Sequence, residues 1–253
     1  FYMRTKSSFI TWGALASSLK AVKATKFWHM RCKPVCGSTE IDLSRWLEQE
    51  PLKNNCNRVV LAGRQNFGRG QHGRIWESSP GGIWLSAAIP MGINVKSSGL
   101  FGLAVAVTVA NTLRENFVPV KLKWPNDLIV NRKKLAGFLP RIFSRGEKVQ
   151  YARVGIGLNV RNRVPKNAIS LAKIFDNRNL SIAEWASKII ISLENLNFLM
   201  GDHRLLCNQA EEILIRDFFE VETGKILKIE GINSDGSLIV DNDGTHKSLY
   251  HWQ

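Results

Sequence analysis

The stretch Gly68-Arg69-Gly70-Gln71-His72-Gly73-Arg74-Ile75-Trp76 combines three glycines, two arginines and a closing tryptophan within nine positions. Glycines let the backbone turn tightly, and each arginine adds a fixed positive charge with several hydrogen-bond donors. A loop that also exposes its backbone N–H groups favours an anionic ligand, above all a phosphate group. The residues alone leave one alternative open, a flexible basic loop on the protein surface.

Two later motifs favour a ligand site over a basic surface loop. The block Lys123-Trp124-Pro125-Asn126-Asp127-Leu128 is followed closely by Lys133-Lys134-Leu135-Ala136-Gly137. A third motif, Gly155-Ile156-Gly157-Leu158-Asn159, places two glycines where a backbone can approach a ligand closely.

The composition is that of an ordinary globular protein. The chain has 253 residues, of which 44% are hydrophobic and 22% charged, enough for one sizeable core and a small second unit. The formal net charge is +14, and half of it lies in residues 1–39, which contain seven Lys or Arg and no acidic residue. Basic surfaces attract nucleic acids, anionic membranes or acidic proteins without distinguishing among them.

The cysteines argue against a zinc-binding or disulfide-bonded protein, and the apolar segments argue against a membrane-spanning one. The cysteines at positions 32, 36, 56 and 207 match no common zinc pattern beyond a loose Cys32-x-x-x-Cys36, so we expect reduced thiols and a reducing compartment. The longest apolar stretch, Leu100 to Ala110, is about half as long as a bilayer requires. It predicts a buried helix, and we expect no membrane partner.

The spacing of apolar residues predicts alternating strands and helices. Strands are expected at residues 28–35, 58–65, 82–90, 118–123, 127–131, 135–143 and 151–160. Helices are expected at residues 39–50, 98–116, 181–199 and 203–220, with Ser38 or Thr39 capping the first and a Ser181-x-x-Glu184 capping box beginning the third. Short strands follow Gly224, separated by a turn at Asn233-Ser-Asp-Gly236.

This order predicts an α+β fold, with a mixed β-sheet backed by helices and then a small C-terminal β-barrel-like domain. We divide the chain into a basic N-terminal extension (1–27), a catalytic domain (28–222) and the small β-domain (223–253). Apolar residues in the extension recur at helix-like spacing and predict a short amphipathic helix on the body of the protein. An organelle-targeting segment stays open as an alternative.

The three motifs, in this order and at this spacing, resemble biotin protein ligase, the family that joins biotin to a lysine of biotin-dependent carboxylases. The resemblance runs from Ser38 to about Asn159 and continues more loosely to the C-terminus. It implies the class II synthetase-like biotin/lipoate ligase fold, ATP and biotin as substrates, and Mg²⁺. It also implies that biotin reacts with ATP to give biotinyl-5'-adenylate, which a lysine of the biotin carboxyl carrier protein of acetyl-CoA carboxylase then attacks.

The resemblance also assigns roles to residues of this chain. It implies catalytic roles for Lys134, Arg69 and Asp127, and places Mg²⁺ at Asn126 and Asp127. The residues that it places around biotin are Ser38, Thr39, Gln65, Gly68, Arg69, Lys134, Gly155 and Gly157. The residues that it places around ATP are Arg69, Gly70, Gly73, Arg74, Trp76, Asn126, Lys134 and Asn159.

Several of these residues also have a purely structural interpretation. Ser38 and Thr39 can cap the helix that follows them, whether or not they contact biotin. Asp127 can cap the turn after Pro125. Lys133 is expected to be a solvated neighbour of Lys134, Trp84 is expected in the core, and the lone His72 receives no role.

Two positions depart from the pattern of the family. Gln71 stands where a second arginine is usual, and a neutral amide keeps hydrogen bonds but loses charge pairing. We therefore expect this protein to retain its adenylate less tightly. Glu40 stands where an asparagine usually follows the Ser-Thr pair, and the sequence gives it no role.

Some members of the family carry an N-terminal DNA-binding domain of about 60 residues, and only 37 residues precede Ser38 here. We therefore expect a catalytic core without DNA binding, acting in the cytoplasm, and assign the basic charge to steering an acidic carrier protein. Monomer and homodimer both stay open. Two other functions stay open: a lipoate ligase, whose Arg-Arg-x-x-Gly-Gly-Gly-type signature is absent, and a catalytically silent basic relative that binds nucleic acid.

Overall fold

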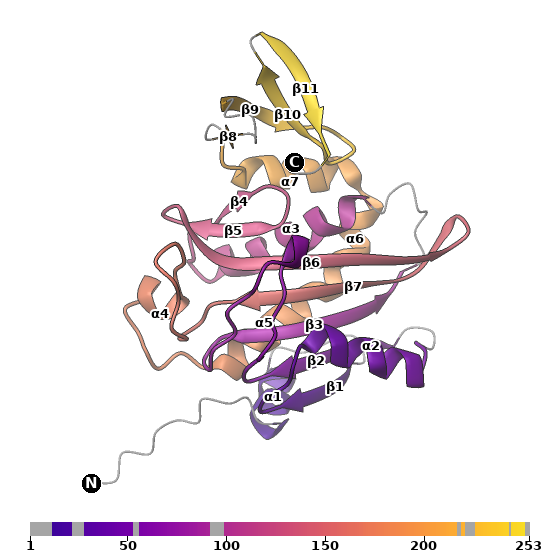
Figure 1. The fold of residues 1–253 in the computed structure, drawn as a ribbon, viewed down its shortest axis with the longest axis vertical. Coiled ribbons are helices and arrows are strands. Elements are labelled where there is room, and N and C mark those ends of the chain that lie inside the picture. Colours follow the sequence, from indigo (N-terminus) through magenta and orange to yellow (C-terminus); the bar gives the residue numbers. More distant parts are fainter. Residues whose placement is uncertain are drawn as a thin grey trace.

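A seven-stranded mixed sheet forms the centre of the molecule (Figure 1). The computed structural model describes residues 12–21, 28–52, 56–91, 99–216, 219–220, 226–242 and 244–250. The strand order is β1-β2-β3-β7-β6-β5-β4, in which β1 and β2 are parallel and all other neighbours antiparallel. The strands are β1 (Trp28–Lys33), β2 (Asn57–Ala62), β3 (Ile83–Pro90), β4 (Lys121–Lys123), β5 (Asp127–Val130), β6 (Lys133–Arg145) and β7 (Lys148–Leu158).

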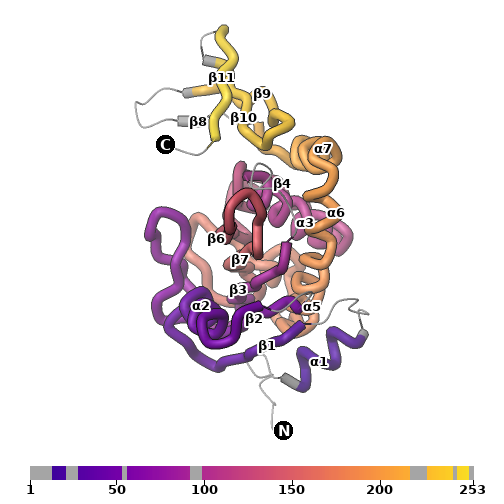
Figure 2. Tube along the Cα trace, turned by 90° about the vertical axis from the view of Figure 1, so that its right-hand side faces the viewer, coloured from indigo at the N-terminus to yellow at the C-terminus, as the bar shows by residue number. Residues whose placement is uncertain are grey.

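Helices cover both faces of this sheet, in unequal numbers. Helix α2 (Thr39–Gln49) lies on one face, and α3 (Phe101–Glu115) and α5 (Ile182–Ser192) lie on the other (Figure 2). The helices α6 (Leu196–Gly201) and α7 (His203–Ile213) extend the second layer toward the C-terminal sheet, and a short α4 (Leu171–Ile174) follows β7. Helix α1 (Trp12–Ala21) packs on α5 through the buried Leu15 and Leu19, so this part of the predicted amphipathic helix is confirmed.

The core has two parts that follow this layering. A large apolar cluster fills the space between the sheet and the helices α3, α5, α6 and α7. A smaller one, made of Leu43, Trp46, Leu47, Val60 and Ala88, joins α2 to the sheet. Burying each large aliphatic or aromatic side chain contributes about 1.5–3 kcal/mol, so α2 is firmly attached where the ligand motifs converge.

The long apolar stretch that begins at Leu100 is a buried helix, as predicted. Residues 103–110 of α3 are all buried against the sheet and the neighbouring helices. None of the helices in the described part of the chain has the length and apolar character that crossing a bilayer requires.

Two predicted helix starts are confirmed, with different capping chemistry. Ser181 caps α5, because its hydroxyl accepts the Glu184 N–H at 3.2 Å. Ser38 occupies the N-cap position of α2 with extended backbone, but its side chain makes no capping bond to any described residue. The hydroxyl of Ser38 is therefore not committed to the helix that it precedes.

The last predicted helix is too long. Helix α7 ends at Ile213 because Leu214 has extended backbone angles, and the N–H of Ile215 donates to the carbonyl of Leu122 at 2.9 Å. Residues 219–220, which we expected in this helix, form strand β8 (Phe219–Glu220). A hydrogen bond to a strand distant in the sequence thus ends the helix, and local periodicity does not reveal it.

The C-terminal β-unit is an open antiparallel sheet in the described residues, so the prediction of a barrel-like domain is wrong. Its order is β11-β10-β9-β8, with β9 (Ile226–Ile232), β10 (Leu238–Asn242) and β11 (Thr245–Leu249). The predicted turn is confirmed: the Gly236 N–H donates to the Asn233 carbonyl at 2.9 Å, and Gly236 has a φ of +84° that suits glycine.

This small sheet is attached to the main body by hydrogen bonds as well as by apolar contacts. The indole N–H of Trp124 donates to the carbonyl of Gly236 at 2.9 Å, and the Glu211 carboxylate accepts the N–H of Ile232 at 2.7 Å. Leu227, Ile229, Ile232, Leu238 and Val240 belong to the large apolar cluster. The small sheet therefore lies beside the turn that carries Trp124 and Asn126.

All four cysteines are free thiols. Burial raises the pKa of the Cys32 thiol to about 11. It does the same for Cys36, where the negative charge of Asp42 raises the pKa further and Lys33 opposes it. Both thiols are therefore protonated, and weak nucleophiles, near neutral pH.

Candidate active site

A cavity of about 870 Å³ opens where α2, the glycine-arginine loop and strands β5 to β7 meet. The three sequence motifs, which lie far apart along the chain, all contribute to its wall. Two predicted site residues, Gly68 and Gly73, lie outside this lining. The predicted site residues that do line it are Ser38, Thr39, Gln65, Arg69, Gly70, Arg74, Trp76, Asn126, Asp127, Lys134, Gly155, Gly157 and Asn159.

One end of the cavity is a network of uncharged hydrogen bonds. The side-chain oxygen of Gln65 accepts the N–H of Thr39 at 2.8 Å and its hydroxyl at 3.0 Å. The Thr39 hydroxyl also lies 2.9 Å from the Ser86 hydroxyl, and the Gln65 amide donates to Ser78 at 2.8 Å. These bonds join the start of α2 to β3 and to the residues after β2, so the network is held in one geometry.

The opposite end carries an ion pair. The Lys134 ammonium lies 2.7 Å from a carboxylate oxygen of Asp127 and 4.9 Å from the centre of the Trp76 ring. Asp127 begins β5 and Lys134 is the second residue of β6, so a tight hairpin brings the two together. Their side chains are 21% and 36% exposed, which leaves the pair accessible to a ligand. Lys133 is exposed and lies outside the cavity lining, as expected.

A floor without side chains lies beneath Trp76. Gly137 and Gly157 face each other across β6 and β7. A Cβ atom on Gly157 would lie 2.4 Å from the Trp76 indole, and one on Gly137 would lie 2.8 Å from the same ring. Contacts that short are forbidden, so this position of Trp76 depends on both glycines. Trp84 is buried beside it, with the two ring centres 6.4 Å apart, as expected of a core residue.

Two asparagines hold the backbone of the charged end. The Asn126 amide donates to the carbonyl of Phe138 at 2.7 Å, and the Phe138 N–H donates back to the Asn126 carbonyl at 3.0 Å. The Asn159 amide donates to the carbonyl of Lys134 at 3.3 Å. Both line the cavity, and both also fix the strands that carry the ion pair.

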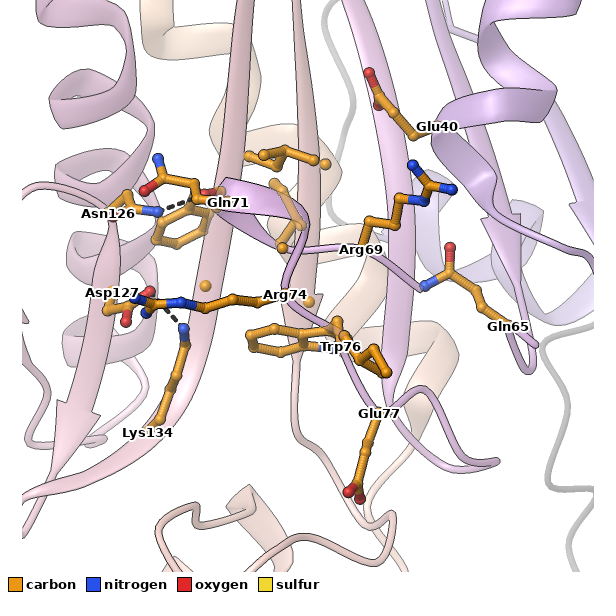
Figure 3. A pocket seen from close by; sticks show the side chains of 18 of the residues that line it. Glu40, Gln65, Arg69, Gln71, Arg74, Trp76, Glu77, Asn126, Asp127 and Lys134 are labelled. Atoms are coloured by element: carbon orange, nitrogen blue, oxygen red, sulfur yellow. Dashed lines mark hydrogen bonds and ion pairs between the residues drawn. The ribbon is translucent and has the colours of Figure 1, made fainter. Parts of the chain in front are cut away.

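The glycine-arginine loop folds back on itself above the cavity. Gly70 donates to the carbonyl of Arg74 at 2.8 Å, and Trp76 donates to that of Gly68 at 2.9 Å. A short 3-10 turn, η1 (Gln71–Gly73), forms its tip. Figure 3 shows Arg74 extending toward the side that holds Asp127 and Lys134, whereas Arg69 extends toward Glu40 and Gln65. The two arginines therefore serve different ends of the cavity.

Some lining residues received no role from the sequence. Ser86 completes the uncharged network, and its only sequence signal is a hydroxyl within the otherwise apolar strand β3. Glu40 lines the cavity from the first turn of α2, and its signal was the departure from the family pattern. His72, which also received no role, belongs to the lining through the loop tip.

The comparisons with known proteins agree with this geometry. The model of the Biotin/lipoate A/B protein ligase family matches residues 39–159, a range that contains the glycine-arginine loop and the two later ligand motifs. The match covers 121 of the 253 residues, just under half of the chain. The resemblance inferred from the three motifs is thereby confirmed. The matched range begins at Thr39, which belongs to the uncharged network, and ends at Asn159, whose amide donates to the carbonyl of Lys134.

Individual proteins with similar sequences are also named as ligases. The chain is 33% identical over 111 residues to the bifunctional ligase/repressor BirA of Bacillus subtilis, covering 43% of this chain and 34% of that protein. It is 28% identical to biotin–protein ligase 2 of Arabidopsis thaliana, covering 83% and 68% of the two chains. The chain thus spans about a third of the length of its bacterial relative and two thirds of the plant one.

Solved structures show the same fold. A biotin protein ligase from Aquifex aeolicus in complex with biotin and ATP superposes with a TM-score of 0.69. The superposition covers 89% of this chain and 96% of that one, at 22% identity. The expected biotin/lipoate ligase fold is confirmed, with the C-terminal sheet open rather than barrel-like.

Proposed function

We propose that this protein is a biotin–protein ligase that uses ATP to form biotinyl-5'-adenylate and transfers the biotinyl group to a lysine of a carrier protein. In the first step the biotin carboxylate attacks the α-phosphate of ATP, and pyrophosphate leaves. In the second step the carrier lysine attacks the activated carbonyl, an amide bond forms, and AMP leaves. Biotin and ATP are thus the substrates of one site.

The observation that carries this proposal is the division of one cavity into an uncharged and a charged end. A ring with polar N–H and C=O groups requires fixed hydrogen-bonding partners, and the network around Thr39 and Gln65 offers them. A carboxylate approaching a phosphate requires cations, and Lys134 and Arg74 supply them at the charged end. Arg69 extends from the same loop as Arg74 toward Gln65 (Figure 3). Cations at the reacting end lower the repulsion between the two anions as they approach each other.

The roles that we propose combine these positions with the resemblance to the family. Lys134 neutralises the charge that builds up between the biotin carboxylate and the α-phosphate. To do so, its ammonium leaves Asp127 and contacts the ligand. Asp127, released from that pair, is placed to orient the incoming carrier lysine, which must lose a proton before it attacks. Arg69 spans the biotin carboxylate and the phosphate, and Trp76 packs beside the adenine.

Magnesium fits the charged end only in combination with phosphates. No group of three or more His, Cys, Asp or Glu side chains in the described ranges is placed to hold a metal ion. Asn126 and Asp127 supply two oxygen-bearing side chains on adjacent residues, and Mg²⁺ is commonly held by one or two such groups plus substrate phosphates and water. In that position Mg²⁺ would neutralise phosphate charge next to Lys134.

For the protein partner, we propose the biotin carboxyl carrier protein of acetyl-CoA carboxylase. A relative from Mycobacterium tuberculosis named biotin–[acetyl-CoA-carboxylase] ligase is 34% identical over 108 residues, covering 40% of this chain and 39% of that protein. The net charge of +14 would speed the encounter with an acidic carrier. A cytoplasmic location, the absence of DNA binding, and the choice between monomer and homodimer stay predictions.

The test is ATP–pyrophosphate exchange with purified protein and Mg²⁺, with biotin, with lipoate, and without an acid. We expect biotin-dependent exchange that falls about 10²- to 10³-fold in Lys134→Ala, the range seen when one charge-stabilising group is removed. Lys133→Ala removes the same charge one residue away, outside the cavity, and should stay within about two-fold.

Two results would overturn the proposal. Exchange with lipoate but not with biotin would make the protein a lipoate ligase. A folded protein that supports no exchange with either acid would favour the silent nucleic-acid-binding alternative, which a salt-sensitive gel shift then tests.

A further inference from the structure

A second, smaller hollow lies beside the hairpin that carries Asp127 and Lys134. It has a volume of about 250 Å³, and no acidic residue in the described part of the chain lines it. Its wall combines three cations with apolar side chains: Lys121, Arg132 and Arg216 with Ile129, Leu214 and Ile215. This basic hollow therefore suits a carboxylate on an apolar stem, such as an acidic side chain of another protein.

The basic hollow lies on the same face of the main sheet as the active site. Lys121 pairs with Ile129 across β4 and β5, and Ile129 pairs with Lys134 across β5 and β6. Residues opposite each other in neighbouring strands share a face of the sheet. Two residues along the first two strands, Lys123 pairs with Asp127, and both line the large cavity. Since strands lie about 4.8 Å apart, the backbone of Lys121 is about 10 Å from that of Lys134.

The charge of Lys121 is not used within the described part of the chain, where its side chain forms no ion pair and no hydrogen bond. Lysines on edge strands often prevent pairing with another chain. Here the edge strand β4, which lies next to α7 in Figure 1, is already covered. Leu214 pairs with Leu122 there, and the Ile215 N–H donates to the Leu122 carbonyl. Protection of the edge therefore does not account for the exposed charge of Lys121.

The other two cations of the basic hollow are held in different ways. Arg216 lies 3.6 Å from a Glu211 oxygen, so part of its charge is already balanced. Arg132 follows Asn131 in the two-residue turn between β5 and β6, where their φ angles are +61° and +50°. Such turns favour Asn-Gly, and a larger side chain in this conformation costs roughly 1–2 kcal/mol. Backbone strain of this kind is concentrated at functional sites, and here it places a guanidinium where glycine would leave none.

We propose that the basic hollow is part of the docking surface for the carrier protein, and that it binds an acidic side chain close to the acceptor lysine of that carrier. In the proposed function the acceptor lysine reaches Asp127 and Lys134, so the carrier also covers the sheet face beside them. Lys121 lies on that face, and opposite charges across the contact orient the carrier and speed its approach. The inference rests on the proposed function for the identity of the partner, and on the position and charge of the hollow for the rest.

The experiment compares two activities: transfer of biotin to purified biotin carboxyl carrier protein, and biotin-dependent ATP–pyrophosphate exchange, which needs no carrier. Lys121→Glu reverses the charge in the hollow. We expect its kcat/KM for the carrier to fall about ten-fold at low salt, whereas exchange should stay within about two-fold of the wild type. At roughly 1 M salt, where the Debye length is about 3 Å, the difference in transfer should largely disappear.

Two further variants serve as controls. Lys121→Arg keeps the charge and should transfer biotin within about two-fold of the wild type. Lys148→Glu makes the same charge reversal at an exposed position on β7 that lines neither the cavity nor the basic hollow. It should leave both activities unchanged.

Transfer by Lys121→Glu that is as fast as by the wild type would overturn the inference. Equal losses of exchange and transfer would show that the hollow binds the phosphates of ATP instead. A loss of transfer that persists at high salt, or that Lys121→Arg shares, would show a structural role rather than a charge contact with the carrier.

The wild-type activities distinguish this inference from the proposed function. Exchange and transfer by the wild type leave the proposed function standing in each of those cases. Exchange without transfer to the carrier would remove the proposed partner and the inference with it. The absence of biotin-dependent exchange would overturn the proposed function itself.

Discussion

The two ends of the cavity are built on different principles. At the uncharged end, Thr39, Gln65 and Ser86 bond to one another and rest on α2 and β3, which the small apolar cluster joins. At the charged end, Arg74 and the pair of Asp127 and Lys134 are partly exposed and are carried by a loop and a hairpin. The hydroxyl and amide groups of the first end are bonded to one another before any ligand arrives, whereas the second end holds charges that a ligand can contact.

This difference matches what the proposed function requires of each end. A network whose hydrogen bonds already have fixed partners binds a ring without reorganising, which favours affinity and selectivity. A lysine paired to an aspartate must exchange that partner for a phosphate, and its charge then acts where the reaction generates charge. Changes at the uncharged end should therefore alter binding of the acid, and changes at the charged end should alter the rate of adenylation.

Apart from Lys134→Ala, the largest effect is expected at the glycine floor beneath Trp76. Gly157→Ala places a Cβ in the space of the Trp76 indole, at 2.4 Å, so the ring must move. Because Trp76 lies next to Lys134, we expect kcat/KM for ATP in the exchange assay to fall by about 100-fold, as displaced catalytic groups commonly produce.

The control for this change is Gly201→Ala, at the end of α6, where a new Cβ meets no atom within 4 Å. It should leave exchange unchanged. Thermal unfolding of both variants separates a moved tryptophan from a misfolded sheet. Full activity in folded Gly157→Ala would show that this position of Trp76 is not required.

The sequence revealed the charged end more completely than the uncharged one. Arg69, Asn126, Asp127 and Lys134 lie in compact motifs, and charged side chains next to glycines are recognisable without a structure. Ser86 was not recognisable, because its position opposite Gly155 depends on the antiparallel register of β3 and β7. A hydroxyl within an apolar strand reveals neither the face that it occupies nor its partners.

The parts of the fold that the sequence did not predict have the same cause, because they depend on contacts between residues that are far apart in the chain. The strands of the main sheet and the helices α2, α3 and α5 followed from apolar spacing, because each buries one continuous face. The end of α7 did not, since a hydrogen bond from Ile215 to the distant Leu122 decides it. The openness of the C-terminal sheet depends likewise on strand pairing, which short apolar runs do not specify.

An intermediate effect is expected at the uncharged end. Thr39→Val removes the hydroxyl that donates to Gln65 and contacts Ser86, so the buried Ser86 hydroxyl loses its partner and the Gln65 oxygen keeps only the Thr39 N–H. We expect the KM for biotin to rise by about ten-fold with little change in kcat, because such groups cost about 1–3 kcal/mol.

Thr108→Val provides the matched control for this variant. The Thr108 hydroxyl is buried in α3 without a hydrogen-bond partner among the described residues, so its removal should leave stability and KM nearly unchanged. A fall in kcat rather than a rise in KM for Thr39→Val would contradict the division of the cavity into a binding end and a reacting end.

The smallest effect is expected at the loop tip, where Gln71 replaces the arginine usual in the family. Gln71 lines the cavity, and Figure 3 shows it on the same side as Asn126, so a cation at this position would lie near the phosphate of the adenylate. Gln71→Arg should therefore slow the release of biotinyl-adenylate by about three- to ten-fold, measured as loss of labelled adenylate from isolated enzyme.

Gln150→Arg adds the same charge at an exposed position on β7 and should not change the release rate. Release from Gln71→Arg that is as fast as from the wild type would show that the loop holds the adenylate without a charge at this position, through its backbone N–H groups and the arginines that remain.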